Sequence, residues 1–127
     1  MADTLNGAKV SPSADVRFKA TFTRTADDID PSTGVATDYT DCTISMAVVE
    51  TPLNTAISTL SIGSGLTRVT NDADSQVISG RIPQATINNY VGKTLAYRFT
   101  LTTQSGGIVS GSDKKPGYYG TFEVRSF

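Results

Sequence analysis

The most regular pattern in this sequence is a run near the C-terminus in which large apolar residues occupy every second position. The apolar positions are Leu95, Tyr97, Phe99 and Leu101, and they alternate with Ala96, Arg98 and Thr100. Successive side chains of a β-strand point to opposite faces, so the alternation predicts a strand over 94–101 with one face on a core. A second such run ends at 119–124. The two runs predict the closing antiparallel strands of an all-β domain.

Similar patterns predict further strands at 16–22, 43–48, 57–62, 66–70 and 76–82. Residues 83–90 lack alternation and begin with Pro83, which the first turn of a helix tolerates, so we expect one short helical turn there that crosses from sheet to sheet. The glycines of Gly63-Ser64-Gly65 are interpreted as hairpin glycines. Seven or eight short strands at this spacing are typical of an immunoglobulin-like antiparallel β-sandwich. The expected core consists of Phe18, Phe22, Ile44, Met46, Val48, Tyr97, Phe99, Leu101 and Phe122.

The first residues of the chain differ from the rest. Residues 1–14 are polar and aperiodic, with Pro12 interrupting any regular element and with Leu5 and Val10 as the main apolar side chains. A segment this poor in apolar residues does not fold by itself. We therefore expect an N-terminal arm over 1–14 that lies along a neighbouring subunit, and one folded domain over 15–127.

Composition limits the classes of partner. The chain has 127 residues, of which 18% are charged, and a net charge of -1. A near-neutral chain without a run of Lys or Arg does not attract nucleic acid, so we expect no nucleic-acid partner. The N-terminus carries an acid at Asp3 and no apolar run behind it. This predicts neither a secretory signal nor a membrane partner, and it predicts synthesis in a cytoplasm.

Few residues here could carry catalysis. The sequence contains no histidine, which removes the ordinary Ser-His-Asp and Cys-His arrangements and imidazole metal sites. Its ten Asp and two Glu lie mostly in turn sequences, where local hydrogen bonding is the expected role. Asp28 and Asp30 have the spacing that begins a calcium loop, but Thr33 stands where that loop needs glycine, which favours a turn. We expect no catalytic residue, no metal and no cofactor.

Two residue types leave alternatives open. Cys42 lies in a strand-like run and is expected to be a buried, inert thiol, with a reactive or intersubunit thiol as the alternative. Of Tyr118 and Tyr119, alternation places one in the core, and the other is a candidate for contact with a protein or a sugar. The candidate contact residues of the whole chain are Leu5, Val10, Asp28, Asp30, Tyr39, Tyr90, Lys114, Lys115 and Tyr119.

The order of these segments resembles a known family. An apolar strand over 16–22 and an Asp-containing approach to a second strand over 37–46 are followed by Gly65-Leu66-Thr67. A short Thr-containing helical turn, a Tyr-x-Phe-x-Leu strand and Gly120-Thr121-Phe122-Glu123-Val124 come after them. This order is similar to that of small immunoglobulin-like virion proteins of tailed bacteriophages, including the N-terminal module of phage baseplate upper proteins. The sequence departs from the family in a long loop over 26–37 and an insertion over 112–117.

The resemblance implies a non-enzymatic structural protein of a bacteriophage virion, synthesised in the host cytoplasm. Its place in the particle would be capsid decoration, neck, tail or baseplate, and its partners would be other phage virion proteins and copies of itself. The alternative is a cell-surface or carbohydrate-binding β-sandwich module. That class needs an exposed aromatic platform, for which Tyr39, Tyr90 and Tyr119 are the candidates. An enzyme would require carboxylates that converge in a pocket.

Overall fold

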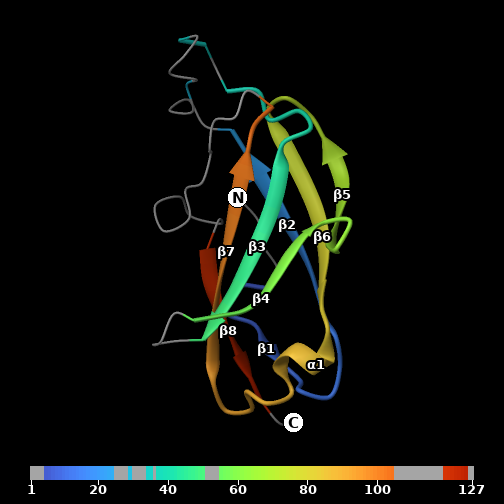
Figure 1. Cartoon of the computed structure of the whole chain (residues 1–127), viewed down its shortest axis with the longest axis vertical. Coiled ribbons are helices and arrows are strands. Elements are labelled where there is room, and N and C mark those ends of the chain that lie inside the picture. The colour runs from blue at the N-terminus through green and yellow to red at the C-terminus, as the bar shows by residue number, and fades with distance from the viewer. Residues whose placement is uncertain are drawn as a thin grey trace.

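The computed structural model describes residues 5–24, 29, 34–35, 37–50, 55–104 and 119–125. Within these ranges eight strands and one short helix are present (Figure 1). They are β1 (Lys9–Val10), β2 (Val16–Thr23), β3 (Thr43–Glu50), β4 (Thr55–Ile62), β5 (Gly65–Asn71), β6 (Ser75–Ile82), α1 (Gln84–Ile87), β7 (Thr94–Thr102) and β8 (Tyr119–Val124). The all-β prediction is confirmed. Each strand predicted from alternation is present, and β1 is an addition.

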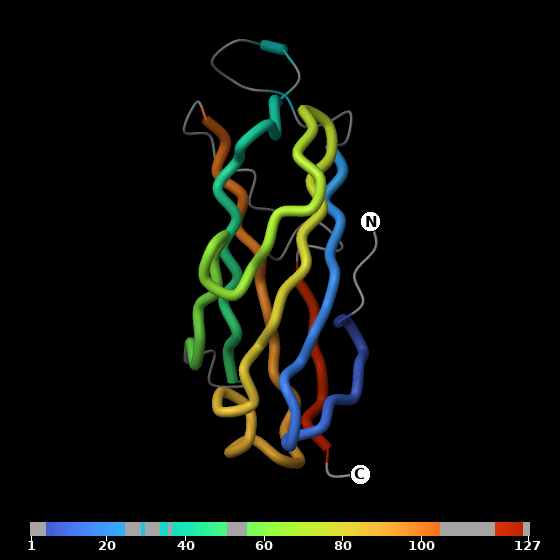
Figure 2. Tube along the Cα trace, turned by 90° about the vertical axis from the view of Figure 1, so that its right-hand side faces the viewer, coloured from blue at the N-terminus to red at the C-terminus, as the bar shows by residue number. Residues whose placement is uncertain are grey.

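The strands form one sheet in the order β1-β8-β7-β3-β4-β5-β6-β2. In this order, β1, β8, β7, β3 and β4 form one group of strands, and β5, β6 and β2 form a second group. The two groups are joined through β4 and β5, which pair only at Ser61 with Gly65 and at Ile62 with Leu66. The sheet folds back at this weak junction and nearly closes into a barrel, so that β3 and β7 lie across from β2 and β6 (Figure 2). The short helix α1 connects β6 to β7, and it thus crosses between the two groups as expected. The immunoglobulin-like assignment stays a prediction.

The glycines between β4 and β5 do not form a hairpin, and that interpretation was wrong. The two strands meet in a short parallel pairing, while β4 pairs antiparallel with β3 and β5 pairs antiparallel with β6. Gly63 and Gly65 have φ values of 87° and 98°, a conformation that favours glycine. A side chain at Gly65 would also lie 2.7 Å from Leu60 Cδ2. The glycines therefore turn the chain from one group of strands into the other.

The predicted core is confirmed, because all nine of its residues are buried. Phe99 of β7 lies at its centre, with ring centroids 4.9 Å from Phe22 and 6.3 Å from Phe18, both on β2. Strands β2 and β7 are not neighbours in the sheet. These aromatic contacts therefore join the two groups of strands across the interior.

Two of the core rings lie against glycines on the adjacent strand. Phe18 pairs with Gly80, and Tyr97 pairs with Gly120. A Cβ atom at Gly80 would lie 2.1 Å from Phe18 Cζ, and one at Gly120 would lie 2.5 Å from the Tyr97 hydroxyl. Each ring occupies the space that a cross-strand side chain would fill, so both strand glycines are needed for packing.

The N-terminal arm packs on its own domain over the residues that the structure describes, so the predicted tether to a neighbouring subunit was wrong for them. Leu5 is 2% exposed and belongs to the core. The segment that follows covers the outer edge of β8, because Gly7 donates to Thr121 O at 2.8 Å and Arg125 donates to Val10 O at 2.9 Å. Backbone pairing needs no apolar sequence pattern, which is why the polarity of the arm gave no sign of β1. Residues 1–4 lie outside the described ranges.

Cys42 is fully buried, and burial raises the pKa of its thiol, which accords with the inert interpretation.

The described part of the chain contains one helix, α1, and this helix is too short to cross a membrane.

Candidate functional site

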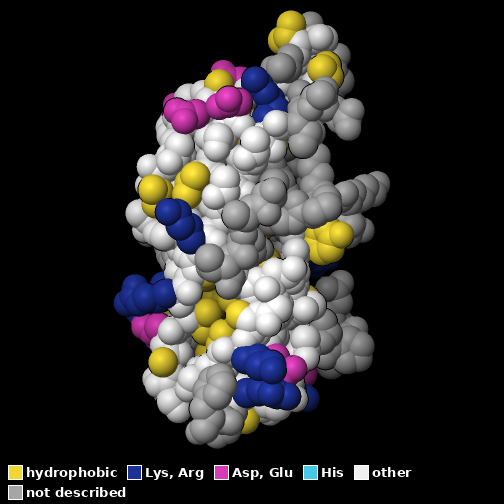
Figure 3. Space-filling view, turned by 180° about the vertical axis from the view of Figure 1, so that it is seen from behind, with side chains coloured by type: hydrophobic (Ala, Val, Ile, Leu, Met, Phe, Trp, Pro, Cys, Tyr) yellow, Lys and Arg dark blue, Asp and Glu magenta, His cyan; other side chains and the backbone are white. Residues whose placement is uncertain are grey.

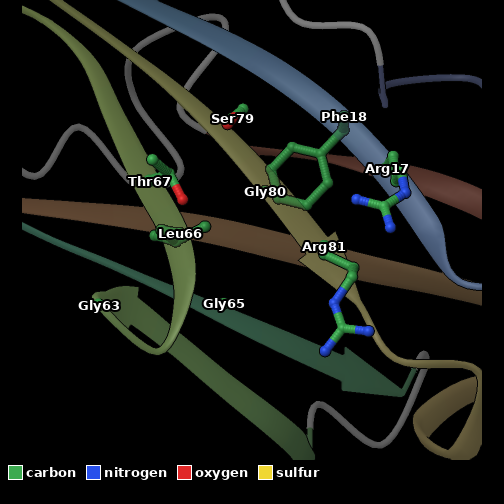
Figure 4. A pocket seen from close by; sticks show the side chains of 9 residues that line it. All are labelled: Arg17, Phe18, Gly63, Gly65, Leu66, Thr67, Ser79, Gly80 and Arg81. Carbon is green, nitrogen blue, oxygen red and sulfur yellow. The ribbon is translucent and has the colours of Figure 1, made fainter.

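A shallow pocket of about 410 Å³ opens on the outside of the group formed by β5, β6 and β2 (Figure 4). Its lining residues are Arg17, Phe18, Gly63, Gly65, Leu66, Thr67, Ser79, Gly80 and Arg81. Three of these residues are glycines and carry no side chain, and the Phe18 ring occupies the space beside Gly80. We call this hollow the arginine pocket.

Two guanidinium groups stand at one side of the arginine pocket. Arg17 on β2 pairs directly with Arg81 on β6, and both side chains are exposed. Like charges directly opposite each other on neighbouring strands are destabilising. Arg81 Nη1 reaches Asp15 Oδ2 at 2.8 Å, which neutralises one of the two charges. Among the described residues no carboxylate forms an ion pair with Arg17.

Asp15 connects the pocket to the helical turn. Its Oδ1 accepts a hydrogen bond of 2.8 Å from the backbone N–H of Gln84, the first residue of α1. This hydrogen bond and the one from Arg81 hold the pKa of the Asp15 carboxyl below its ordinary value. The charged form of Asp15 is therefore the one that the folded protein favours.

The lowered pKa of Asp15 gives a pH dependence with a defined sign. A carboxyl whose folded-state pKa is depressed stabilises the protein above its unfolded pKa, about 3.9, and loses that contribution as pH falls through the folded value. We expect Asp15→Asn to lower the Tm at neutral pH, and the difference from the parent protein to shrink as the solution is acidified. Thermal melts from neutral to acidic pH measure it, with the exposed Asp72→Asn as the control. A difference that grows on acidification contradicts the assignment.

The predicted contact residues fall into three groups. Leu5 and Tyr39 are buried in the core, so their prediction as surface contacts was wrong; each is an apolar or aromatic side chain that fills the interior. Val10 and Tyr90 are partly buried and pack against that core. Tyr119 is exposed at 40%. Asp28, Asp30, Lys114 and Lys115 lie outside the described residues, as do most of the loop 26–37 and the insertion 112–117.

Tyr119 lies beside a second hollow, of about 380 Å³, on the other group of strands. This hollow is lined mainly by β7 and β8, and Asn6 and Arg98 supply polar groups to it. Neither Tyr39 nor Tyr90 contributes to it. The three tyrosines that were candidates for one aromatic platform therefore do not form one.

Gln76, which the sequence patterns did not single out, is the hub of a buried polar network at the other end of β6. Its side chain is fully buried, and its Nε2 donates to Tyr39 O at 2.9 Å and to Asn71 Oδ1 at 2.8 Å. Its Oε1 accepts a hydrogen bond from Arg68, which also donates to Cys42 O at 2.6 Å. The network fixes residues 39–42 to the β5–β6 hairpin, which is a structural role.

Sequence alone could not bring Arg17 and Arg81 together. Alternation places Arg17 outward on its own strand, but residues 64 positions apart become neighbours only through the register of β2 on β6. Alternation within one strand shows which face a side chain takes, but it does not show which strand will lie beside it or which residues will be paired.

Within the described residues no group of three or more His, Cys, Asp or Glu side chains could hold a metal ion. No protein-family model matches this sequence, and a search of curated proteins gives no significant match.

Proposed function

We propose that this chain is a non-enzymatic structural protein of a bacteriophage virion that acts through contacts with other virion proteins and with copies of itself. The proposal combines the sequence resemblance to small virion proteins with a rigid all-β scaffold. Capsid decoration, neck, tail and baseplate are all compatible places for it.

The observation that carries the protein-contact role is the arginine pocket. Its polar groups are two guanidinium groups and the hydroxyls of Thr67 and Ser79, all of which donate hydrogen bonds. Guanidinium groups bind carboxylates through paired hydrogen bonds, and glycines let a partner approach the sheet backbone closely. Neither hydroxyl has a neighbouring base among the residues that line this pocket. Such a surface suits adhesion to a carboxylate-bearing protein.

A carbohydrate-binding module is the second candidate, and the hollow beside Tyr119 is the observation in its favour. A single exposed ring flanked by Asn6 and Arg98 offers stacking together with hydrogen bonds. Replacing Tyr119 by Ala separates the two candidates. Loss of binding on a glycan array supports the carbohydrate module, and absence of any glycan binding by the parent protein excludes it.

Analysis of purified particles tests the proposed function. We expect the chain to be present in particles of the phage that encodes it, at a constant copy number per particle that matches a rotational symmetry. Quantitative mass spectrometry of gradient-purified particles measures the copy number, with a host cytoplasmic protein as the contamination control. A chain that stays in the lysate and never sediments with particles contradicts the proposal.

A further inference from the structure

We propose that copies of this chain associate head to tail, with the acidic end of one copy docked on the arginine pocket of the next. This contact specifies one partner within the proposed function. It depends on the proposed function only for the claim that the contact forms in a virion. It identifies one of the partners as a second copy of the chain and names the two surfaces that meet.

The receiving surface is the arginine pocket. Arg17 and Arg81 face each other across β2 and β6, and Asp15 is the only described carboxylate that pairs with either. An additional carboxylate at this point would relieve the repulsion between the two guanidinium groups. The hydroxyls of Thr67 and Ser79 border the same hollow and supply further donors. The pocket therefore has one positive charge, on Arg17, that no described carboxylate pairs with, and the donors to bind a carboxylate.

The acidic end is the β5–β6 turn with the loop packed beside it. Four exposed aspartates gather there, namely Asp38, Asp41, Asp72 and Asp74. Asp38 accepts a hydrogen bond from Thr40 N, and Asp41 accepts one from Asn71. The carboxylates of Asp72 and Asp74 accept none from the described residues, so they are available to a partner.

Neighbouring cations do not neutralise this end. Arg24 and Arg68 are the cations there. The Arg24 guanidinium donates to the backbone carbonyls of Thr37 and Ala73, and the Arg68 guanidinium donates to Cys42 O and Gln76 Oε1. Four carboxylates against two guanidinium groups leave the acidic end with a net negative charge. It is thus complementary to the arginine pocket.

Strand β6 separates the two surfaces. It begins at Ser75, next to the acidic turn, and ends at Ile82, next to Arg81. On the face shown in Figure 3, acidic side chains gather at the upper end while most Lys and Arg side chains lie lower. A contact between opposite ends of identical chains is heterologous, and its repetition produces a ring or a stack. Both arrangements suit a repeated component of a symmetric particle.

Charge reversal on each surface tests the contact with the purified full chain. Sedimentation velocity at protein concentrations up to about 1 mM detects association with a Kd as weak as about 1 mM. We expect the parent protein to associate at low salt and to dissociate as NaCl rises to about 0.5 M, because salt screens exposed charges. Arg17→Glu, and separately the double variant Asp72→Lys with Asp74→Lys, should each weaken association at least about tenfold.

Mixing the two variants is the decisive measurement. The Arg17→Glu protein retains its acidic end and the double variant retains its pocket, so an equimolar mixture should associate more strongly than either protein alone. Lys9→Glu is the matched control for Arg17→Glu, because it makes the same change in net charge at an exposed site on β1. Unchanged circular dichroism and Tm establish that each variant is folded.

Three results overturn the inference: a parent protein that is monomeric at every concentration, variants that associate as well as the parent, or a Lys9→Glu protein that is weakened equally. The proposed function has a separate readout. A monomeric parent protein that is nevertheless found in particles removes the head-to-tail contact and leaves the virion role standing. Self-association of a chain that is absent from particles removes the virion role and leaves the head-to-tail contact standing.

Discussion

Replacing Phe99 by Ala should lower the free energy of unfolding by about 3–5 kcal/mol, a large part of the stability of a domain this size. The Phe99 side chain is fully buried on β7, a strand with neighbours on both sides. Its ring meets Phe22 edge-on, with an interplanar angle of 68°, and it meets Tyr97 at 74°. Truncation therefore opens a cavity where the two groups of strands contact each other across the core.

Urea unfolding at constant protein concentration measures this effect. Phe99→Leu should lose less, about 1–2 kcal/mol, and it provides a folded comparison if the alanine variant does not fold. Thr100→Ala is the matched control, since Thr100 is the next residue on the same strand and is only partly buried. Its loss should stay below about 1 kcal/mol. A loss below about 1 kcal/mol for Phe99→Ala would mean that the interior closes without the ring, contrary to the contacts described.

Replacing Gln76 by Met should lower the free energy of unfolding by about 2–3 kcal/mol, although Met is apolar and of similar length. The substitution removes the donor to Tyr39 O and to Asn71 Oδ1 and the acceptor for Arg68. Buried polar groups that lose their partners keep their desolvation penalty, which is the source of the loss. The β5–β6 hairpin should then hold residues 39–42 less firmly.

Cys42 offers a local measurement of that change, because it is the only cysteine in the chain and its carbonyl accepts from Arg68. We expect a thiol reagent to label Cys42 faster in Gln76→Met than the loss of global stability explains. Gln104→Ala is the matched control, since this exposed amide donates to Asp41 O, in the same loop. Its loss should stay below about 1 kcal/mol. Equal losses for the two variants would show that Gln76 has no special role in the network.

The sequence by itself determined every described strand except β1, and it determined nine of the side chains that fill the core. Phe18, Phe22 and Phe99 could be assigned to the interior from alternation alone, because strand geometry imposes a period of two and one-sided burial then fixes which residues are apolar. The helical turn between β6 and β7 followed from a proline and the loss of alternation. These features depend on residues close together in the chain, so local patterns are sufficient to predict them.

Only the tertiary structure decided which strands pair, and with that the position of every surface feature. The pairing of Arg17 with Arg81, the fold of β1 onto β8 and the turn at Gly63 all depend on register or on backbone hydrogen bonds between distant segments. Backbone groups are the same in every residue, so they leave little trace in the sequence. The burial of Tyr39 could not be predicted from the sequence either. Tyr39 has no alternating neighbours, and its burial depends on the β5–β6 hairpin that lies beside it.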